Sequence, residues 1–145
     1  MTTTLDDIVD IFELLGDWDQ RYQYLIELGE KLPVMPEQLK TEDNKVKGCM
    51  SQVWVQVYSD KDDADKLHFH GDCDTSIIKG VLALLIQLVD AKSADEIQQL
   101  DVDEFFERLS LGEHLSPSRH VGIYAIVTLM KQQASELQKQ RTKVA

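Results

Sequence analysis

The sequence predicts an α+β fold in which a small three-stranded antiparallel sheet packs against several helices. Apolar residues recur at helical spacing towards both ends of the chain, and they alternate with a period of two in the segment between. The strands expected there are short, sequential and closely connected, which favours antiparallel pairing. The chain has 145 residues, so we expect one domain, residues 1–145, large enough to bury most of the surface of the unfolded chain.

Two helices are expected before the strands. Thr4 can cap the first, whose apolar stripe ends at Gly16. Asp17 can cap the second, which runs from Trp18 towards Leu32, and Pro33 terminates it. Apolar stripes of this kind face a protein core far more often than a cofactor, so we expect both helices to be structural.

The three expected strands are Lys45–Lys47, Gln52–Tyr58 and Leu67–His70. In the second strand, valines alternate with larger or polar residues, as a strand with one buried face requires. A loop at residues 34–44, with room for one helical turn, precedes the strands. The charged segment 59–66 is expected to join the last two as a solvated turn.

The most apolar segment of the chain, Ile77 to Asp90, is expected to be the central buried helix, capped by Asp74 or Thr75. Gly80 lies inside this helix and Gly122 inside the last one, although glycine costs about 1 kcal/mol there relative to alanine. Close approach of another backbone at each point is the economical reason. The remaining helices are expected after the cap Ser93, from Asp101 to Leu109 with Gly112 closing it, and from Pro117, behind its cap Ser116, to about Gln140.

Composition and charge exclude several classes of function. The net charge of −11 and the lack of a basic stripe argue against a nucleic-acid-binding groove. The longest apolar run, Val81 to Ile86, is too short to span a bilayer, and the first residues lack the pattern of a signal peptide. Two cysteines without such a signal indicate a reducing compartment. We therefore expect a cytoplasmic protein that uses neither nucleic acid nor a membrane.

The stretch 46–54 is organised around Cys49. Cys49 follows Gly48 and precedes the strand expected at residues 52–58, which puts it in a tight turn. A large partner can approach a thiol at the tip of a turn, whereas it cannot approach one within a strand. The competing interpretation is an inert cysteine of the core, which is common. The residues alone leave both interpretations open.

The motif Gly48-Cys49-Met50-Ser51-Gln52-Val53-Trp54 resembles the signature of the SufE/CsdE family of sulfur-acceptor proteins. The resemblance spans nearly the whole chain and continues through Gly71-Asp72-Cys73-Asp74, Ile77-Ile78-Lys79-Gly80 and Leu115-Ser116-Pro117-Ser118-Arg119 with Gly122. It implies a SufE/NifU-like fold. It also implies that Cys49 takes a persulfide sulfur from a PLP-dependent cysteine desulfurase of the SufS or CsdA type, stimulates that enzyme and passes the sulfur to an iron–sulfur cluster scaffold or a related pathway.

The same resemblance implies an accessory protein rather than an enzyme, with no cofactor of its own because the desulfurase holds the PLP. It assigns Cys49 as the persulfide acceptor. It assigns supporting or partner-contact roles to Gly48, Met50, Ser51, Gln52, Asp74 and Arg119. It names neither the particular desulfurase nor the downstream acceptor, and it leaves a homodimer open.

Arg119 is placed against its local electrostatics. It falls in the first turn of the last expected helix, where the helix dipole slightly disfavours a cation. A guanidinium near Cys49 would favour the thiolate, or the persulfide anion that the thiolate becomes. Chance is also an adequate explanation of an exposed arginine at this position.

A second constellation consists of His68, His70, Asp72 and Cys73, which offer nitrogen, oxygen and sulfur ligands close together. Their spacing matches no zinc motif, and paired histidines on an exposed strand are commoner than ligands. For these reasons a metal-binding scaffold for cluster assembly ranks behind the sulfur carrier, as the alternative function. A purely structural adaptor is a third. Cys73 stands where the family usually has serine, which leaves open an inert replacement, a second sulfur stop or a disulfide with Cys49.

Overall fold

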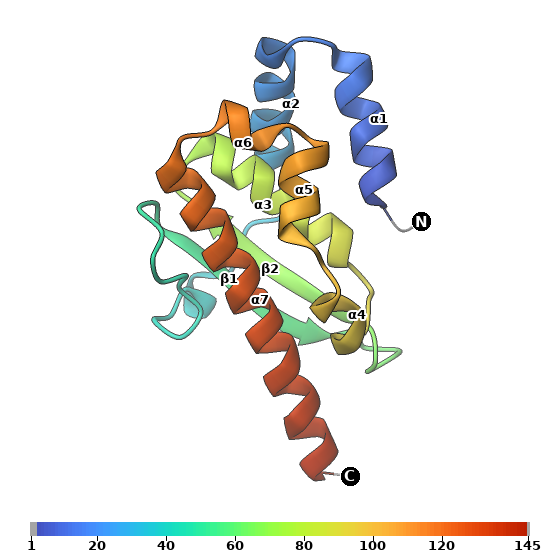
Figure 1. Cartoon of the computed structure of the whole chain (residues 1–145). Helices are drawn as coiled ribbons and strands as arrows, with labels where there is room; N and C mark the ends of the chain where they lie inside the picture. The colour runs from blue at the N-terminus through green and yellow to red at the C-terminus, as the bar shows by residue number, and fades with distance from the viewer. Residues whose placement is uncertain (1–2, 145) are drawn as a thin grey trace.

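The computed structural model describes residues 3–144 (Figure 1). Its elements follow one another as α1 Leu5–Leu15, α2 Trp18–Lys31, one turn of 3-10 helix at Glu37–Leu39, β1 Val53–Ser59, β2 Leu67–Cys73, α3 Ser76–Val89, α4 Ala94–Gln98, α5 Val102–Arg108, α6 Leu111–His114 and α7 Pro117–Val144. The predicted α+β class is confirmed. In this described part of the chain, no helix combines the length and apolar character that crossing a bilayer requires.

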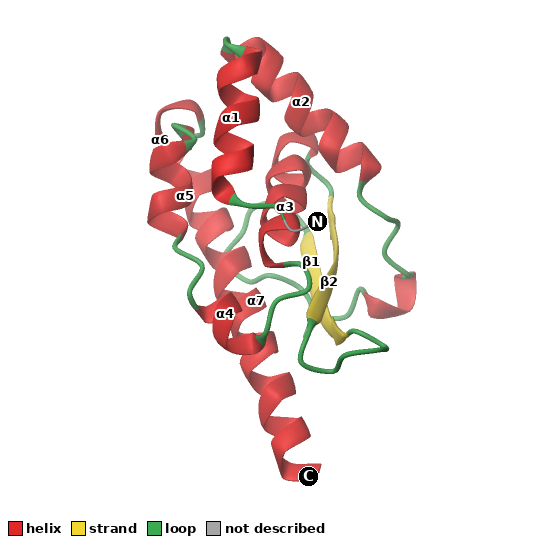
Figure 2. Cartoon of the chain, turned by 90° about the vertical axis from the view of Figure 1, so that its right-hand side faces the viewer, coloured by secondary structure: helices red, strands yellow, loops and turns green. Residues whose placement is uncertain are grey.

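The two strands stand along one side of the molecule, with the helices on one face of them and the loop that follows α2 on the other (Figure 2). Helix α3 contacts both β2 and α2, and α7 contacts β1. The predicted central position of α3 is confirmed, because residues 81, 82, 84 and 85 of this helix are completely buried. The most apolar helix of the chain therefore packs against β2, α7 and α2.

Helix starts follow the caps that the sequence predicts. At each of three helices, a side-chain oxygen accepts a hydrogen bond from a backbone N–H three residues ahead. The pairs are Thr4 with Asp7 at 3.2 Å, Asp17 with Gln20 at 2.9 Å and Ser93 with Glu96 at 3.1 Å. Local sequence is sufficient here because a cap and its partner lie within one helical turn.

The expected three-stranded sheet is wrong in the described residues, where the sheet has two strands. β1 and β2 pair antiparallel from Val53 opposite Cys73 to Ser59 opposite Leu67. Where the third strand was expected, Lys45 forms only an isolated bridge with Trp54.

Residues 44–46 pair with β1 only at its start, where Val46 N donates to Val53 O at 2.8 Å and Val55 N donates to Asn44 O at 2.9 Å. Further along this edge of β1 another group takes their place. The side chain of Gln133, from α7, accepts a hydrogen bond from Val57 N at 3.1 Å and donates one to Val55 O at 2.8 Å. These are bonds that a neighbouring strand would make. The pairing of residues 44–46 therefore stops at Val55, and beyond it a glutamine side chain covers the edge of β1, which limits pairing with a further strand.

Helices α2 and α3 cross at two glycines. A Cβ atom added to Gly80 would collide with the backbone carbonyl of Leu25, and one added to Gly29 would lie 3.0 Å from the backbone nitrogen of Gly80. The predicted close approach at Gly80 is confirmed, since only a residue without a side chain fits there.

Gly112 does not close α5, contrary to the prediction. Ser110 follows α5 with φ at 55°, in the left-handed region, and Gly112 lies within the short helix α6. The prediction failed because glycine is the usual residue in a left-handed helix end, and here a serine adopts that conformation.

Candidate functional site

Cys49 lies in a loop, residues 47–52, whose first end is tied to β1. Val46 N donates to Val53 O at 2.8 Å, which brings the two ends of the loop together. Gly48 then has φ at 84°, in the left-handed region that favours glycine, and a Cβ atom added there would meet nothing within 4 Å. Gly48 is therefore required by the backbone conformation of the turn and not by crowding.

The other end of the loop is tied to the segment that leads into α3. Asp74 Oδ1 accepts from Gln52 N at 3.1 Å, and Asp74 N donates to Gln52 O at 3.1 Å. The hydroxyl groups of Ser51 and Thr75 lie 2.6 Å apart, and the Thr75 hydroxyl donates to Asp74 Oδ1. Thr75 is the N-cap residue of α3, but its side chain makes no capping bond to that helix. Both residues predicted as caps instead hold the Cys49 loop.

The thiol of Cys49 rests against α7 at Gly122. A Cβ atom added to Gly122 would lie 2.7 Å from Cys49 Sγ, well inside van der Waals contact. Gly122 is buried, whereas Cys49 is half-buried and Met50 beside it is 88 % exposed. The sulfur is therefore partly covered by a helix, next to a side chain that projects into solvent.

Cys49 and Arg119 line the same pocket. It has a volume of about 270 Å³ and is lined by Cys49, Met50, Ser51, Ile78, Ser116, Ser118 and Arg119. Arg119 Nη1 is buried and makes no hydrogen bond, while the hydroxyls of Ser116 and Ser118 lie 3.2 Å apart. Arg119 thus lines the same small cavity as the thiol, and one donor of its guanidinium, which is closed off from solvent, has no partner among residues 3–144.

Cys73 is a buried free thiol at the end of β2. Burial raises its pKa from 9.0 to about 11, and Thr75 N donates to its sulfur at 3.4 Å. Cys49 is also a free thiol, so the two cysteines are not joined by a disulfide.

The sequence model of the SufE family, described as an Fe–S metabolism associated domain, matches residues 6–134. The chain belongs to the SufE family. An uncharacterised SufE-like protein of Rhizobium meliloti (strain 1021) is 41 % identical over 133 residues, which cover 91 % of this chain and 95 % of the relative. A second such protein, of Rhizobium etli, is 39 % identical over 132 residues, covering 90 % of this chain and 89 % of the relative.

The fold of this SufE-family chain also matches a solved structure. The solution structure of a hypothetical protein from Thermus thermophilus superposes with a TM-score of 0.75 and covers 93 % of this chain and 96 % of its own. The two sequences are 19 % identical, so this likeness concerns the fold alone.

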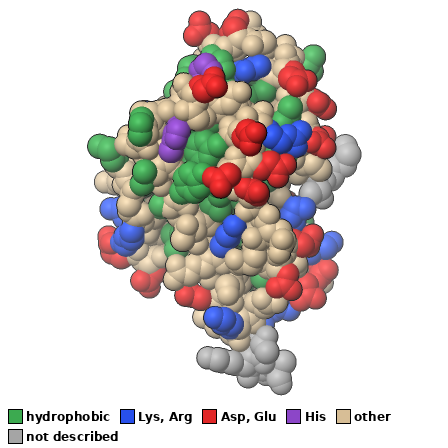
Figure 3. Space-filling model, viewed as in Figure 1, with side chains coloured by type: hydrophobic (Ala, Val, Ile, Leu, Met, Phe, Trp, Pro, Cys, Tyr) green, Lys and Arg blue, Asp and Glu red, His purple; other side chains and the backbone are tan. Residues whose placement is uncertain are grey.

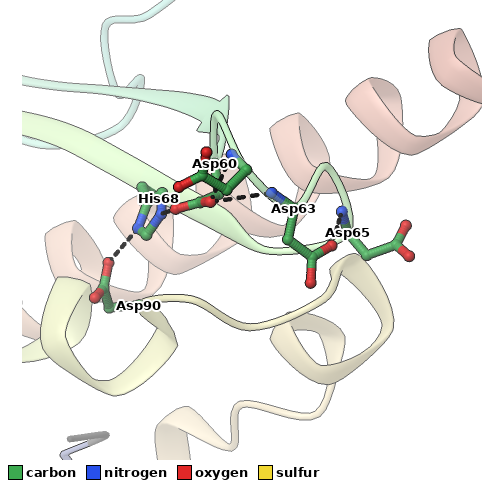
Figure 4. Close-up of polar contacts among 6 residues, drawn as sticks. Asp60, Asp63, Asp65, His68 and Asp90 are labelled. Carbon is green, nitrogen blue, oxygen red and sulfur yellow. Dashed lines mark hydrogen bonds and ion pairs between the residues drawn. The ribbon is translucent and has the colours of Figure 1, made fainter.

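The four residues of the alternative metal site do not converge in this SufE-family structure. His68 Nδ1 lies 2.7 Å from Asp90 Oδ1, and its Nε2 lies 2.7 Å from Asp60 Oδ1 (Figure 4). The hydrogen bond with Asp90, followed by that with Asp60, raises the pKa of His68, although burial acts in the opposite direction. The bond from His68 in turn lowers the pKa of Asp60. His68 is thus engaged by two carboxylates, one from the β1–β2 turn and one from the end of α3.

The other three residues of that constellation have separate partners. His70 stacks on Tyr58 with ring centroids 4.4 Å apart. Asp72 pairs with Lys40 at 2.7 Å and with Lys79 at 3.3 Å. Cys73 is buried in the core. Throughout residues 3–144, no group of three or more His, Cys, Asp or Glu side chains is placed to hold a metal ion.

Two residues at the site were not predicted to contact the Cys49 loop. Gly122 was expected to admit another backbone, but the atom that comes nearest to it is the Cys49 sulfur. Thr75 was expected only as a helix cap. The signal at Gly122 was present in the sequence as a glycine inside a helix, but nothing in it identified the contacting residue.

Proposed function

We propose that Cys49 accepts the outer sulfur of a persulfide carried by a PLP-dependent cysteine desulfurase of the SufS or CsdA type. The Cys49 thiolate attacks that sulfur, a new S–S bond forms on Cys49, and the desulfurase cysteine leaves as a thiolate. The transfer is redox-neutral, so this chain needs no oxidant and no cofactor. The sulfur then passes to an iron–sulfur cluster scaffold or a related sulfur pathway.

The observation that carries this proposal is the position of the Cys49 thiol. It lies on a short loop held at both ends, against Gly122 and beside a pocket lined by Arg119, whose guanidinium has a nitrogen without a partner among the described residues. A persulfide is anionic and easily lost to solvent thiols, so a carrier benefits from partial cover and from a nearby cation. Membership of a family associated with Fe–S metabolism supports the same conclusion.

A carrier must also release its sulfur from cover, and the loop offers a route. Among the described residues, nothing lies within 4 Å of the place where a Gly48 side chain would be, so the chain has space on that side of Gly48. We propose that docking of the desulfurase turns the loop outward about Gly48 and exposes Cys49. Equal reactivity of Cys49 towards small and protein-sized thiol probes would contradict this movement.

Exposed apolar side chains next to the site suggest where the desulfurase docks and how it is stimulated. Met50 adjoins Cys49, and Val121, which is 59 % exposed, adjoins Gly122. On the face shown in Figure 3, hydrophobic side chains gather where α5 and α7 meet and acidic side chains border them. Tyr124 of α7 is also exposed and stacks on Phe106 of α5, so the exposed apolar side chains of α7 extend to where it meets α5. Burial of Met50 and Val121 by a partner would hold the loop in its outward position.

The decisive experiment replaces the sulfur atom of Cys49. Cys49→Ser preserves the shape of the loop, but a serine oxygen cannot carry sulfane sulfur. After incubation with desulfurase and cysteine, mass spectrometry should show one added, reductant-labile sulfur on the parent protein and none on the variant. The matched control, Cys73→Ser, should gain sulfur like the parent.

Stimulation of the desulfurase separates a carrier from an adaptor. The Cys49→Ser variant should fail to increase sulfide release under conditions in which the parent does. Undiminished stimulation by the variant would show that the protein is an adaptor, acting through its surface alone, and not a carrier.

We also propose that the protein acts in the cytoplasm, where a free thiol persists.

A further inference from the structure

Arg119 is the arginine whose side chain has neither a hydrogen-bond partner nor an ion-pair partner among residues 3–144. The other arginines have clear partners: Arg21 donates to Phe12 O, Arg108 pairs with Asp6 and Glu104, and Arg141 pairs with Asp65. Arg119 forms no ion pair within residues 3–144, and its Nη1 atom is buried without a hydrogen bond. In a chain with 26 acidic residues and a net charge of −11, a guanidinium without a carboxylate or carbonyl partner among residues 3–144 is unusual. A buried charged donor is costly unless an acceptor is supplied from elsewhere.

The lining of the pocket offers donors besides those of Arg119. The hydroxyls of Ser116 and Ser118 bond to each other at 3.2 Å, which uses one of their two protons and leaves the other free. Both serines lie at the N-terminal end of α7, the positive end of a long helix dipole. Ser51 contributes no donor, since the Thr75 hydroxyl donates to Asp74 and Ser51 must therefore donate to Thr75. The lining side chains that still offer a donor are thus Arg119 and the Ser116–Ser118 pair.

The cavity is larger than a persulfide requires. Its volume is about 270 Å³, whereas one water molecule, which is close in size to a single added sulfur atom, takes up about 30 Å³. A molecule of several heavy atoms fits beside Cys49 even when the persulfide is present. Taken together, the size, the free donors and the unpaired cation describe a receptor for a small anion.

We infer that this pocket binds a small oxyanion-bearing sulfur nucleophile, whose oxygens contact Arg119 and the Ser116–Ser118 pair while its sulfur lies next to Cys49. This inference rests on the proposed function, because it names the class of acceptor that takes sulfur from the Cys49 persulfide. Two sources share the chemistry: a free sulfur oxyanion such as sulfite, and a small thiol that carries a carboxylate.

The transfer balances without another reagent. The nucleophile's sulfur attacks the outer sulfur of the persulfide, a new S–S bond forms, and the old S–S bond breaks with its electron pair left on Cys49. With sulfite the products are thiosulfate and the Cys49 thiolate. With a thiolate attacking the protonated persulfide, the products are a small persulfide, which keeps the proton, and the Cys49 thiolate.

Binding is tested on the thiol form of the protein, independently of sulfur transfer. Sulfate, which is not a nucleophile, is titrated while amide signals are followed by NMR, with chloride at equal ionic strength as reference. We expect saturable shifts confined to residues 47–51 and 116–120, and at least tenfold weaker binding in Arg119→Gln. The control variant Arg108→Gln should bind like the parent. Shifts that chloride reproduces, or that persist in Arg119→Gln, would overturn the inference.

Transfer is tested on protein loaded with sulfur by a desulfurase and then desalted. Loss of the added sulfur is timed by mass spectrometry in sulfite, in 3-mercaptopropionate and in 2-mercaptoethanol, which lacks a carboxylate. Saturation with sulfite alone identifies the sulfur oxyanion as the acceptor class, and saturation with 3-mercaptopropionate alone identifies the thiol carboxylate. In either case Arg119→Gln should abolish saturation, and 2-mercaptoethanol should show none.

The outcomes separate the two proposals. Rates that rise linearly for all three nucleophiles and do not change in Arg119→Gln would overturn the acceptor site while leaving Cys49 a carrier. Sulfate binding by a protein that never gains sulfur from a desulfurase would instead overturn the carrier function, and with it the assignment of the bound anion as an acceptor.

Discussion

Cys49 Sγ lies over Gly122, so close that a Cβ atom on residue 122 would come within 2.7 Å of it. The contact joins the loop before β1 to the first turns of α7, which are more than seventy residues apart in the sequence. A glycine in a helix interior costs about 1 kcal/mol relative to alanine. The space that this glycine leaves is occupied by the atom that we propose to carry sulfur.

We predict that Gly122→Ala exposes Cys49 without unfolding the protein. The added methyl group must displace either the thiol or the helix, and a short loop yields more easily than a helix of 28 residues. Helix propensity gains about 1 kcal/mol, which offsets part of the lost contact. Alkylation of Cys49 by a bulky maleimide, measured by mass spectrometry, should be faster than in the parent.

The matched control for that variant is Gly112→Ala. A Cβ atom there meets only His120 Cε1 at 3.9 Å, an ordinary contact. Its alkylation rate should equal that of the parent. An unchanged rate of Cys49 alkylation in Gly122→Ala, together with a lower Tm, would show that the added methyl group displaces the helix and not the loop.

Cys73 should be chemically silent in the folded protein. Its pKa of about 11, against 9.0 for the exposed thiol, reduces the reactive thiolate at pH 8 by about a hundredfold. In Cys49→Ser, where Cys73 is the remaining thiol, a chromogenic disulfide reagent should react slowly until denaturant is added. Rapid reaction of the native variant would contradict the burial and would revive Cys73 as a second sulfur stop.

His68 should make stability depend on pH. Its pKa in the folded state is raised by Asp90 and Asp60, so its contribution is fully present below the unfolded value, about 6.5, and is lost as pH rises through the folded pKa. We expect the parent to exceed His68→Gln in free energy of unfolding by more at pH 5.5 than at pH 9. Urea unfolding at the two pH values measures the difference.

Asp90→Asn provides the control for that pH dependence. The amide keeps an oxygen near His68 but removes the carboxylate whose hydrogen bond is the largest cause of the raised pKa. The difference between the two pH values should shrink in this variant. A difference of equal size would assign the effect to other titrating groups.

Gln133 should contribute to stability through the edge of β1. Gln133→Ala leaves Val57 N and Val55 O without their bonds in a part-buried setting, which we expect to lower the free energy of unfolding by about 1–3 kcal/mol. Gln132→Ala is the control, since Gln132 is exposed and bonds only to Glu136 among the contacts of residues 3–144. Equal midpoints in urea for the two variants would contradict this role.

Interactions that span one helical turn or one strand could be predicted from the sequence. The caps at Thr4, Asp17 and Ser93 depend on a residue and the amides just ahead of it. The alternation that buries Val53 and Val55 follows from the two-residue period of a strand. The position of Cys49 in a turn was predicted in the same way, because the turn is tied off by neighbours such as Val46 and Val53.

The tertiary structure alone decided which distant groups meet. Residues 45–47 have strand-like alternation, yet they form no strand beside β1, where the side chain of Gln133 reaches across from α7. Likewise, only the docking of α7 against the loop places Gly122 under Cys49 and opens the pocket onto Arg119. Such contacts depend on how whole elements pack to bury a common core, so no local pattern specifies the partner. The sequence by itself therefore determined the elements and the turn that carries the thiol, and packing determined what surrounds that thiol.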